Sequence, residues 1–386
     1  MKSFPGFADE LPGEEAGRPG RALIVAEIGT SHNGDLTKAR ELLAAAAASG
    51  ADAAKFQLVY ADEILHPACG AVELPGGSVP LYERFRSLER DADFYAELKT
   101  LTEEAGLVFI CSPFGIRSAR ILRDIGAPAI KIASPELNHF PLLREVASYD
   151  RSIILSSGVS TLSDIEKALA VMDEVSGSGG VTLLHCVTAY PAPEEEYNIR
   201  LIPNLAAVFG VKAGVSDHSA DPVLVPALAA LYGAAMIEKH FTLDAGGGGL
   251  DDPIALTPPL FARMVREIRD AENEAAAGRV AEAREALEAA YGRDRVRRVL
   301  GNGVKALAPA EAANYATTRR SVHALGEISA GELFTEENTA LLRSEKNLRP
   351  GLSPELWDLI LKRQSARTIF AGEGITWDDI LSPGDT

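Results

Sequence analysis

The sequence has little cysteine and no long apolar run. Its 386 residues include three cysteines, Cys69, Cys111 and Cys186, which are far apart and form no metal-binding or redox motif. An odd and sparse count is typical of a protein in a reducing cytoplasm, where we expect this chain. No apolar run reaches the roughly 18 residues of a membrane span, and residues 1–20 lack the apolar core of a signal peptide.

Positive charge is also scarce, with 38 Lys and Arg against 55 Asp and Glu, a net charge of −17. This balance argues against nucleic acid or an anionic membrane as the main partner, because both would be repelled. An anionic substrate would need a local basic pocket set against that overall field.

Apolar runs and helical patterns alternate along residues 22–272. Runs predicted as strands are 22–28, 53–58, 107–111, 129–132, 152–155, 181–185, 211–215 and 234–238. Predicted helices are 36–49, 93–105, 116–125, 140–147, 162–175, 201–209, 223–231 and 259–272. Eight such units in roughly 250 residues predict a (β/α)8 TIM barrel. The alternative, a doubly wound sheet, would need fewer strands and a glycine-rich first turn, which is absent.

Composition changes divide the rest of the chain. The segment Tyr60–Arg90 interrupts the alternation of strand-like runs and helical patterns. It predicts a lid or an interface element, or else a surface loop without a role. Residues 271–290 read as one helix, and the tail contains strand-like pieces at 321–324 and 366–370. The predicted units are a disordered tail over 1–20, a catalytic barrel over 21–290, a linker over 291–318 and a small domain over 319–386.

Polar side chains follow the predicted strands at the edge where a barrel carries its active site. His218 and His240 follow the last two strands, and two converging imidazoles can hold a divalent metal. Taken alone, each histidine could equally be a structural residue of the core. Lys55 and Lys131, with nearby serines, suit a small anion bearing phosphate and carboxylate, and a Schiff-base lysine is the alternative. Glu27 places a carboxylate in an apolar strand, which is costly without a partner.

An ordered set of motifs runs through the chain. It reads Ala26-Glu27-Ile28-Gly29, His32-Asn33-Gly34, Gly50 to Gln57, Lys131-Ile132-Ala133-Ser134, Leu155-Ser156-Ser157-Gly158, His185-Cys186, Tyr190-Pro191, Ser216-Asp217-His218 and Glu238-Lys239-His240-Phe241. Together these motifs resemble the sialic acid synthase family, phosphoenolpyruvate-dependent nonulosonate synthases. The tail after Arg319 resembles that family's C-terminal antifreeze-like (SAF) domain, a β-clip fold.

The resemblance implies a metal-dependent condensation. His218 and His240 would bind Mn2+ or Mg2+, which polarises the aldehyde of an N-acyl hexosamine such as N-acetylmannosamine. C3 of phosphoenolpyruvate would attack that aldehyde, water would add at C2, and phosphate would leave by C–O cleavage. Glu27 would orient or deprotonate the water, with Asp251 in the same region. The residues expected to bind phosphoenolpyruvate are Lys55, Ser112, Lys131, Ser134, Ser156 and Ser216, and the further substrate-binding candidates are Gln57, Thr188 and Tyr190.

Several positions depart from the family pattern. Thr188 stands where the family has Asn, and a glycine run precedes Asp251, so that Asp252 and Asp244 remain alternatives for this carboxylate. The family's SAF domain extends an arginine to the sugar bound by the partner subunit in a domain-swapped homodimer. Here that arginine is Arg343 or Arg349, and the spacing does not decide between them.

The acceptor sugar stays open at this stage. A 2,4-diacetamido-trideoxy hexose in place of N-acetylmannosamine would yield legionaminate, pseudaminate or a spore-coat sugar acid. Two other classes of function also remain: a metal-independent lysine aldolase, and a non-catalytic carbohydrate-binding relative.

Overall fold

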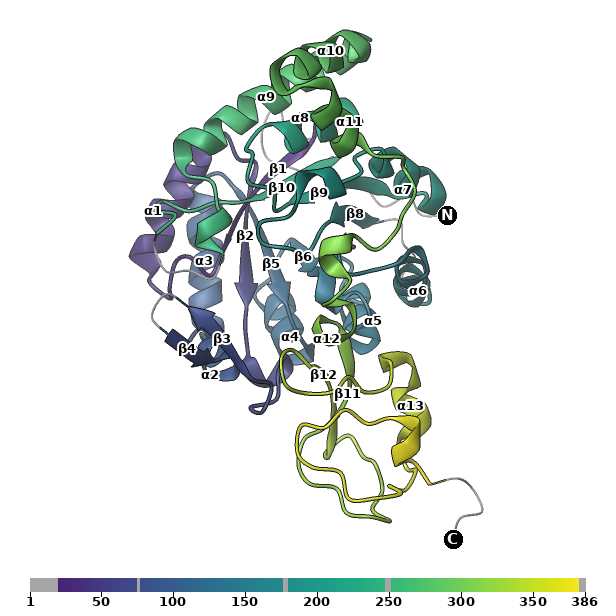
Figure 1. Cartoon of the computed structure of the whole chain (residues 1–386). Helices are drawn as coiled ribbons and strands as arrows, with labels where there is room; N and C mark the ends of the chain where they lie inside the picture. The colour runs from purple at the N-terminus through teal and green to yellow at the C-terminus, as the bar shows by residue number, and fades with distance from the viewer. Residues whose placement is uncertain (1–19, 75–76, 176–179, 247–250, 382–386) are drawn as a thin grey trace.

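The computed structural model describes residues 20–74, 77–175, 180–246 and 251–381. Parallel strands close into a barrel in the order β1-β10-β9-β8-β7-β6-β5-β2, which confirms the predicted TIM barrel (Figure 1). The barrel strands are β1 (Leu23–Gly29), β2 (Ala53–Leu58), β5 (Val108–Pro113), β6 (Ala129–Ile132), β7 (Ser152–Ser156), β8 (Val181–Cys186), β9 (Lys212–Asp217) and β10 (Met236–His240).

Helices cover the outside of the barrel. They are α1 (Leu36–Ala48), α3 (Ala92–Glu104), α4 (Ile116–Asp124), α5 (Phe140–Ala147), α6 (Leu162–Asp173), α7 (Leu201–Phe209), α8 (Leu224–Leu231) and α9 (Pro258–Ala276). The last two strands, β9 and β10, end two residues beyond their predicted ends. The sequence pattern predicted that they end at residues 215 and 238. The parallel ladder continues beyond these positions, with Lys239 paired to Asp217 and Glu27 paired to His240.

The period-two alternation of a strand sorts the barrel side chains into two sets. One set packs outward against the helices, in the large core. The other faces the barrel axis, and near the amino ends of the strands it is apolar. This inner layer consists of Leu23, Val25, Ala53, Val108, Ile110, Ala129, Ile154, Leu184 and Met236. Apolar side chains therefore fill the barrel at the amino ends of its strands, and a ligand can enter only at the carboxyl ends.

The insertion between residues 60 and 90 is an interface element within the chain. It contains a hairpin of β3 (Ala71–Leu74) and β4 (Gly77–Pro80), followed by α2 (Leu81–Arg86). Its first turn contacts the C-terminal domain, where the Arg343 amide donates to the Ile64 carbonyl at 2.9 Å. Glu63 of the same turn accepts from the Arg117 amide at the start of α4.

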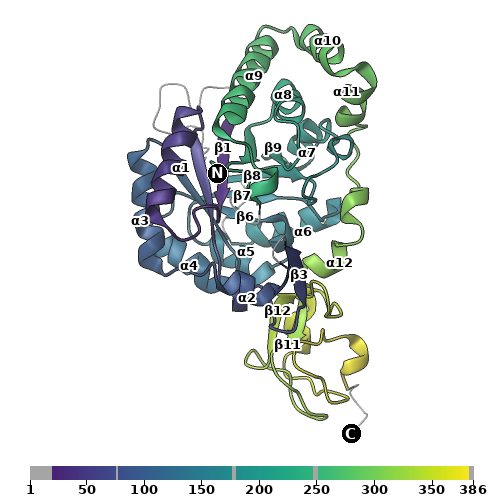
Figure 2. The same ribbon diagram turned by 60° about the vertical axis from the view of Figure 1, so that its left-hand side comes forward.

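The predicted helix over 271–290 is wrong in one respect, because it is two helices. Helix α9 ends at Ala276, and α10 (Val280–Tyr291) begins after a turn in which Gly278 has φ of +73°. A left-handed residue breaks the helix, and glycine adopts that conformation readily. Helix α11 (Arg293–Leu300) follows, and the linker then passes beside the barrel to α12 (Tyr315–Thr318) (Figures 1 and 2). The predicted tail over 1–20 lies outside the described residues, except for Gly20.

The C-terminal domain is small and loop-rich, as predicted. Strands β11 (Arg320–Ala324) and β12 (Thr339–Arg343) pair antiparallel, and the short helix α13 (Trp357–Ile360) packs beside them. The sequence pattern did not indicate β12. The predicted strand at 366–370 is wrong, because only an isolated bridge forms there, between Ile369 and Ile328.

A buried ion cluster fixes this domain to its own barrel. Glu136, in the turn after β6, pairs through one carboxylate oxygen with Arg320 at 2.5 Å and through the other with Arg343. Asn138 donates to the Arg320 carbonyl at 2.8 Å. Among the described residues, no helix is long and apolar enough to cross a membrane.

Candidate active site

The side chains facing the barrel axis change from apolar to polar at the carboxyl ends of the strands. There they enclose a pocket of about 70 Å³. Its lining includes most of the residues selected from the sequence: Glu27, Lys55, Gln57, Ser112, Lys131, Ser134, Ser156, Thr188, Tyr190, Ser216, His218 and His240. It also includes Phe114, Ala133, Pro135, Cys186 and Glu238, which sequence reasoning left out of the site.

Two lysines and two glutamates form an alternating cluster at the base of this pocket. Lys55 Nζ lies 2.8 Å from Glu27 Oε2 and 3.6 Å from Glu238 Oε1. Lys131 Nζ lies 3.1 Å from both oxygens of Glu238. All four side chains are almost completely buried, so their charges interact in a medium of low polarity. Gln57 completes the cluster by donating to Glu27 at 2.8 Å.

These contacts shift the pKa values in different directions. Burial raises the pKa of Glu27 above its usual value, although Lys55 opposes this. Burial also raises the pKa of Glu238, but Lys131 and Lys55 outweigh it and hold that pKa at about 2. Burial lowers the pKa of Lys131 despite its pairing, whereas Glu238 and Glu27 overcome burial at Lys55 and raise its pKa. Glu27 is therefore the carboxyl group in the cluster better suited to take up a proton.

Glu238 is the most important residue that sequence reasoning missed. It lies two residues before His240 on β10, and side chains two apart on a strand face the same side. Its carboxylate contacts Lys131, Lys55 and the Ser216 hydroxyl, which donates at 2.9 Å. The period-two spacing from His240 was the signal that could have identified it.

Several hydroxyl groups line the same pocket as the two lysines. Among the described residues, the buried Oγ atoms of Ser112 and Ser156 and the Oγ1 atom of Thr188 have no hydrogen-bond partner. Buried polar atoms are nearly always satisfied, so unpartnered ones in a pocket indicate that a ligand satisfies them. Ser134 is different, because its hydroxyl accepts from the Gly158 amide at 3.0 Å. The Ser112 and Ser156 hydroxyls, which line the same pocket as the two lysines, suit a phosphate and a carboxylate.

The two histidines converge as the sequence predicted. Their ring centroids lie 5.3 Å apart, and Tyr190 stacks on His218 at 4.4 Å. His218 Nδ1 lies 3.0 Å from the Val187 carbonyl, which can only accept, so Nδ1 carries the proton and Nε2 presents a lone pair. Burial lowers the pKa of both imidazoles and keeps them neutral, the form that binds a metal.

The donor set fits a divalent metal with open coordination positions. Within the described part of the chain, no group of three or more His, Cys, Asp or Glu side chains stands at metal-binding distance. The protein therefore offers two imidazoles, and Asp251 Oδ2 lies 3.8 Å from His240 Nδ1 at the margin. Of the three candidate aspartates, Asp251 pairs with His240, whereas Asp252 accepts from Ser31 at 2.5 Å and Asp244 accepts from the Gly246 amide.

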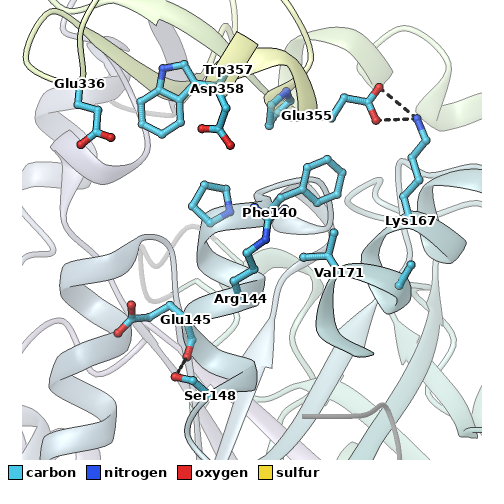
Figure 3. A pocket seen from close by; sticks show the side chains of 13 residues that line it. Phe140, Arg144, Glu145, Ser148, Lys167, Val171, Glu336, Glu355, Trp357 and Asp358 are labelled. Atoms are coloured by element: carbon cyan, nitrogen blue, oxygen red, sulfur yellow. Dashed lines mark hydrogen bonds and ion pairs between the residues drawn. The ribbon is translucent and has the colours of Figure 1, made fainter. Parts of the chain in front are cut away.

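Neither candidate arginine reaches this pocket from its own chain. Arg343 is buried against Glu136, and Arg349 pairs with Asp379 inside the C-terminal domain while its side chain remains 44% exposed. A larger cleft of about 630 Å³ lies between helices α5 and α6 and the C-terminal domain (Figure 3). Figure 3 shows the pair of Lys167 and Glu355 bridging it at 2.8 Å. This cleft contains none of the residues selected from the sequence.

Comparison with known proteins agrees with this geometry. The model of the NeuB family matches residues 42–280, and that of the SAF domain matches residues 319–381. The chain is 34% identical to the spore coat polysaccharide biosynthesis protein SpsE of Bacillus subtilis over 97% of both chains. The crystal structure of that protein superposes with a TM-score of 0.79, covering 96% of this chain and 97% of the other.

Enzymes that make nonulosonic acids are similar over most of the chain. The N,N'-diacetyllegionaminic acid synthase of Campylobacter jejuni is 32% identical over 84% of this chain and 90% of its own. The pseudaminic acid synthase of Helicobacter pylori is 31% identical over 92% of this chain and 97% of its own.

Proposed function

The chain belongs to the NeuB family, and we propose that it condenses phosphoenolpyruvate with an N-acyl hexosamine to give a nine-carbon 2-keto acid and phosphate. The observation that carries this proposal is the pocket itself. Two buried lysines suit phosphate and carboxylate together with Ser112 and Ser156, whose hydroxyls have no partner among the described residues, and the same pocket holds two neutral imidazoles suited to a divalent metal. The names of similar proteins support the same class of reaction.

Each part of the pocket has a task in this reaction. Lys55 and Lys131 bind the phosphate and carboxylate of phosphoenolpyruvate, and the free hydroxyls of Ser112 and Ser156 complete their hydrogen bonding. His218 and His240 hold Mn2+ or Mg2+, which when bound polarises the aldehyde oxygen of the acceptor.

A carbon–carbon bond forms between C3 of phosphoenolpyruvate and the aldehyde carbon, and the aldehyde oxygen takes up a proton. Water then adds at C2, and the C2–O bond breaks to release phosphate. Glu27, whose pKa burial raises, orients this water and accepts its proton. Gln57 and Lys55 hold the Glu27 carboxylate in place from two sides.

The acceptor side of the pocket lies around Thr188 and Tyr190, above the histidines. Thr188 offers a free hydroxyl at this point, and Tyr190 covers the His218 ring. Among the acceptors, a 2,4-diacetamido-trideoxy hexose is a strong candidate because a legionaminic acid synthase is 32% identical. N-acetylmannosamine remains the simpler alternative.

The test is phosphate release from phosphoenolpyruvate with Mn2+, measured with N-acetylmannosamine, with both series of 2,4-diacetamido-trideoxy hexoses, and without sugar. We expect release that requires one of the sugars and disappears with a chelator. Borohydride added during turnover separates this reaction from that of a lysine aldolase. A trapped adduct on Lys55 or Lys131, with turnover that ignores the chelator, would contradict the proposal.

A domain-swapped homodimer is part of the proposal. Among the described residues that line the pocket there is no arginine, and the Arg349 side chain is partly exposed, whereas Arg343 is held by Glu136. We therefore assign Arg349 to the pocket of the second copy. Light scattering should give a dimer mass, and Arg349→Ala should raise the acceptor KM without changing that mass.

A further inference from the structure

Glu311 reaches the barrel mouth from the linker and is completely buried there. It ends the short turn Pro309–Glu311 between α11 and α12. Its Oε1 accepts from the Val159 amide at 2.7 Å and from the Thr188 amide at 2.6 Å, and its Oε2 accepts from the Ala308 amide at 3.3 Å. One carboxylate therefore joins the loops that follow β7 and β8 to the linker.

The peptide unit between Val187 and Thr188 connects Glu311 to the proposed metal site. Its N–H group donates to Glu311, and its C=O group accepts from His218 Nδ1 at 3.0 Å. A peptide unit is planar and rigid, so both contacts share one orientation. The bond to the carbonyl sets the tautomer and ring plane of His218, which is how outer contacts tune a metal ligand.

The loop after β7 shows that this region is held in a constrained conformation. Val159 has φ of +41°, a left-handed conformation that is unfavourable for a β-branched residue, and its amide donates to Glu311. A Cβ atom on the neighbouring Gly158 would lie 2.1 Å from the Thr188 hydroxyl oxygen and 3.1 Å from Glu311 Oε1. The loops therefore approach closely at the point that Glu311 joins.

We propose that Glu311 is a positioning residue for the metal end and the acceptor side of the pocket. It acts through the 187–188 peptide unit, which orients His218 and carries the Thr188 hydroxyl. The inference rests on the proposed function, because it takes His218 as a metal ligand. It assigns to the linker a part in the site besides joining the two domains.

The test measures Mn2+ affinity by titration calorimetry, together with phosphoenolpyruvate affinity. Glu311→Ala removes the acceptor for both amides, and we expect about a 10-fold loss of Mn2+ affinity. Phosphoenolpyruvate affinity measured without metal should change by less than about 2-fold, because Lys55, Ser112 and Lys131 lie on β2, β5 and β6, whose loops Glu311 does not join. Glu311→Gln keeps one oxygen for the two amides and should retain affinity within about 3-fold of the wild type.

Glu196→Ala is the matched control. Glu196 Oε2 accepts from the Ala310 amide at 2.9 Å, so this variant weakens the same linker turn without touching the pocket. We expect its Mn2+ affinity to match that of the wild type. An equal loss in Glu196→Ala and Glu311→Ala, or wild-type affinity in a folded Glu311→Ala, would overturn the proposal. If Glu311→Ala does not fold, Glu311→Asp withdraws the carboxylate by one methylene and serves in its place.

Amide hydrogen exchange separates this inference from the proposed function. Glu311→Ala should speed exchange at the Val159 and Thr188 amides, whereas Glu196→Ala should leave exchange at both amides unchanged. If the wild type binds Mn2+ but releases no phosphate with any sugar, the proposed reaction fails while the Mn2+ comparison still decides the role of Glu311. A wild type that binds no Mn2+ overturns the metal part of both proposals, and exchange then shows only whether Glu311 positions Thr188.

Discussion

Replacing Glu136 with Gln should loosen the C-terminal domain from the barrel. Glu136 is completely buried and is the anionic partner of Arg320 and Arg343. Glu136→Gln keeps the volume but removes the carboxylate that Arg320 and Arg343 share, and Arg343 keeps only the longer pair with Glu345 at 4.0 Å. Breaking a buried ion pair from one side costs about 3–5 kcal/mol. Arg320 retains carbonyl acceptors at Leu341 and Phe114, which places the expected cost near the lower bound, about 3 kcal/mol.

The two tryptophans make the assay specific for one domain. The chain has two Trp residues, Trp357 and Trp377, and both lie in the C-terminal domain. Their fluorescence in a urea titration reports that domain, while far-UV circular dichroism is dominated by the barrel. In Glu136→Gln the fluorescence transition should move to lower urea and separate from the dichroism transition.

Glu355→Gln is the control, because the Glu355 pair with Lys167 bridges the same two domains at the surface. Both of its side chains are more than one-third exposed, so the expected cost is below about 1 kcal/mol. If the two variants lose the same stability, the buried cluster does not carry the docking and the reasoning is refuted.

The effect should also depend on pH in a defined direction. Burial raises the pKa of Glu136, but Arg320 and Arg343 outweigh it and hold the pKa below its ordinary value of 4.5. A carboxyl group whose pKa is depressed on folding contributes stability above 4.5 and loses it as the pH falls through the lower folded value. The gap between wild type and Glu136→Gln should therefore be constant from about pH 6 to 8 and shrink below 4.5. A gap that stays unchanged at lower pH would count against the cluster.

Three further predictions concern the pocket. His218→Ala should abolish Mn2+ binding and chelator-sensitive phosphate release, and full activity in a metal-stripped variant would contradict the metal site. Lys131→Ala should raise the KM for phosphoenolpyruvate by at least about 10-fold and change the KM for the sugar far less. The control is Lys239→Met, which removes a completely buried lysine paired with Asp217 at 2.7 Å. This variant should lower stability and leave the ratio of the two KM values unchanged. Ser156→Ala should weaken phosphoenolpyruvate binding several-fold, by about 1 kcal/mol, without loss of stability, because its hydroxyl has no partner within the described residues; a large loss of stability would mean that this hydroxyl is structural.

The barrel and its mouth were predictable because both follow from the period of a strand. Residues two apart share a face, so the sequence alone places Lys55 and Gln57 together. The same rule would have identified Glu238 from His240. Glu238 was passed over because the predicted strand ended at residue 238, before His240, and because its partner Lys131 lies more than 100 residues away in sequence.

The contacts that depend on the path of the linker were not predictable. Glu311 contacts Val159 and Thr188 across more than 120 residues, and no local pattern specifies which loop a turn will touch. The same holds for Glu136, which lies two residues after the Lys131-Ile132-Ala133-Ser134 motif but pairs with two arginines of the other domain. Loop contacts of this kind depend on packing, whereas strand and helix patterns depend on local periodicity.

The charges of the pocket bear on how an anion can bind there. Lys55 and Lys131 are each matched by a carboxylate, so the cluster with Glu27 and Glu238 is close to neutral and lies inside a protein of net charge −17. The lysines alone therefore supply little net attraction for a substrate that carries phosphate and carboxylate. A divalent cation on the two histidines would change this balance, because it adds positive charge to the same pocket. We accordingly expect Mn2+ to tighten phosphoenolpyruvate binding and phosphoenolpyruvate to tighten Mn2+ binding by the same factor. Titrations of each ligand with and without the other should give equal ratios above one, and a ratio of one would mean that the hydroxyls and lysines suffice.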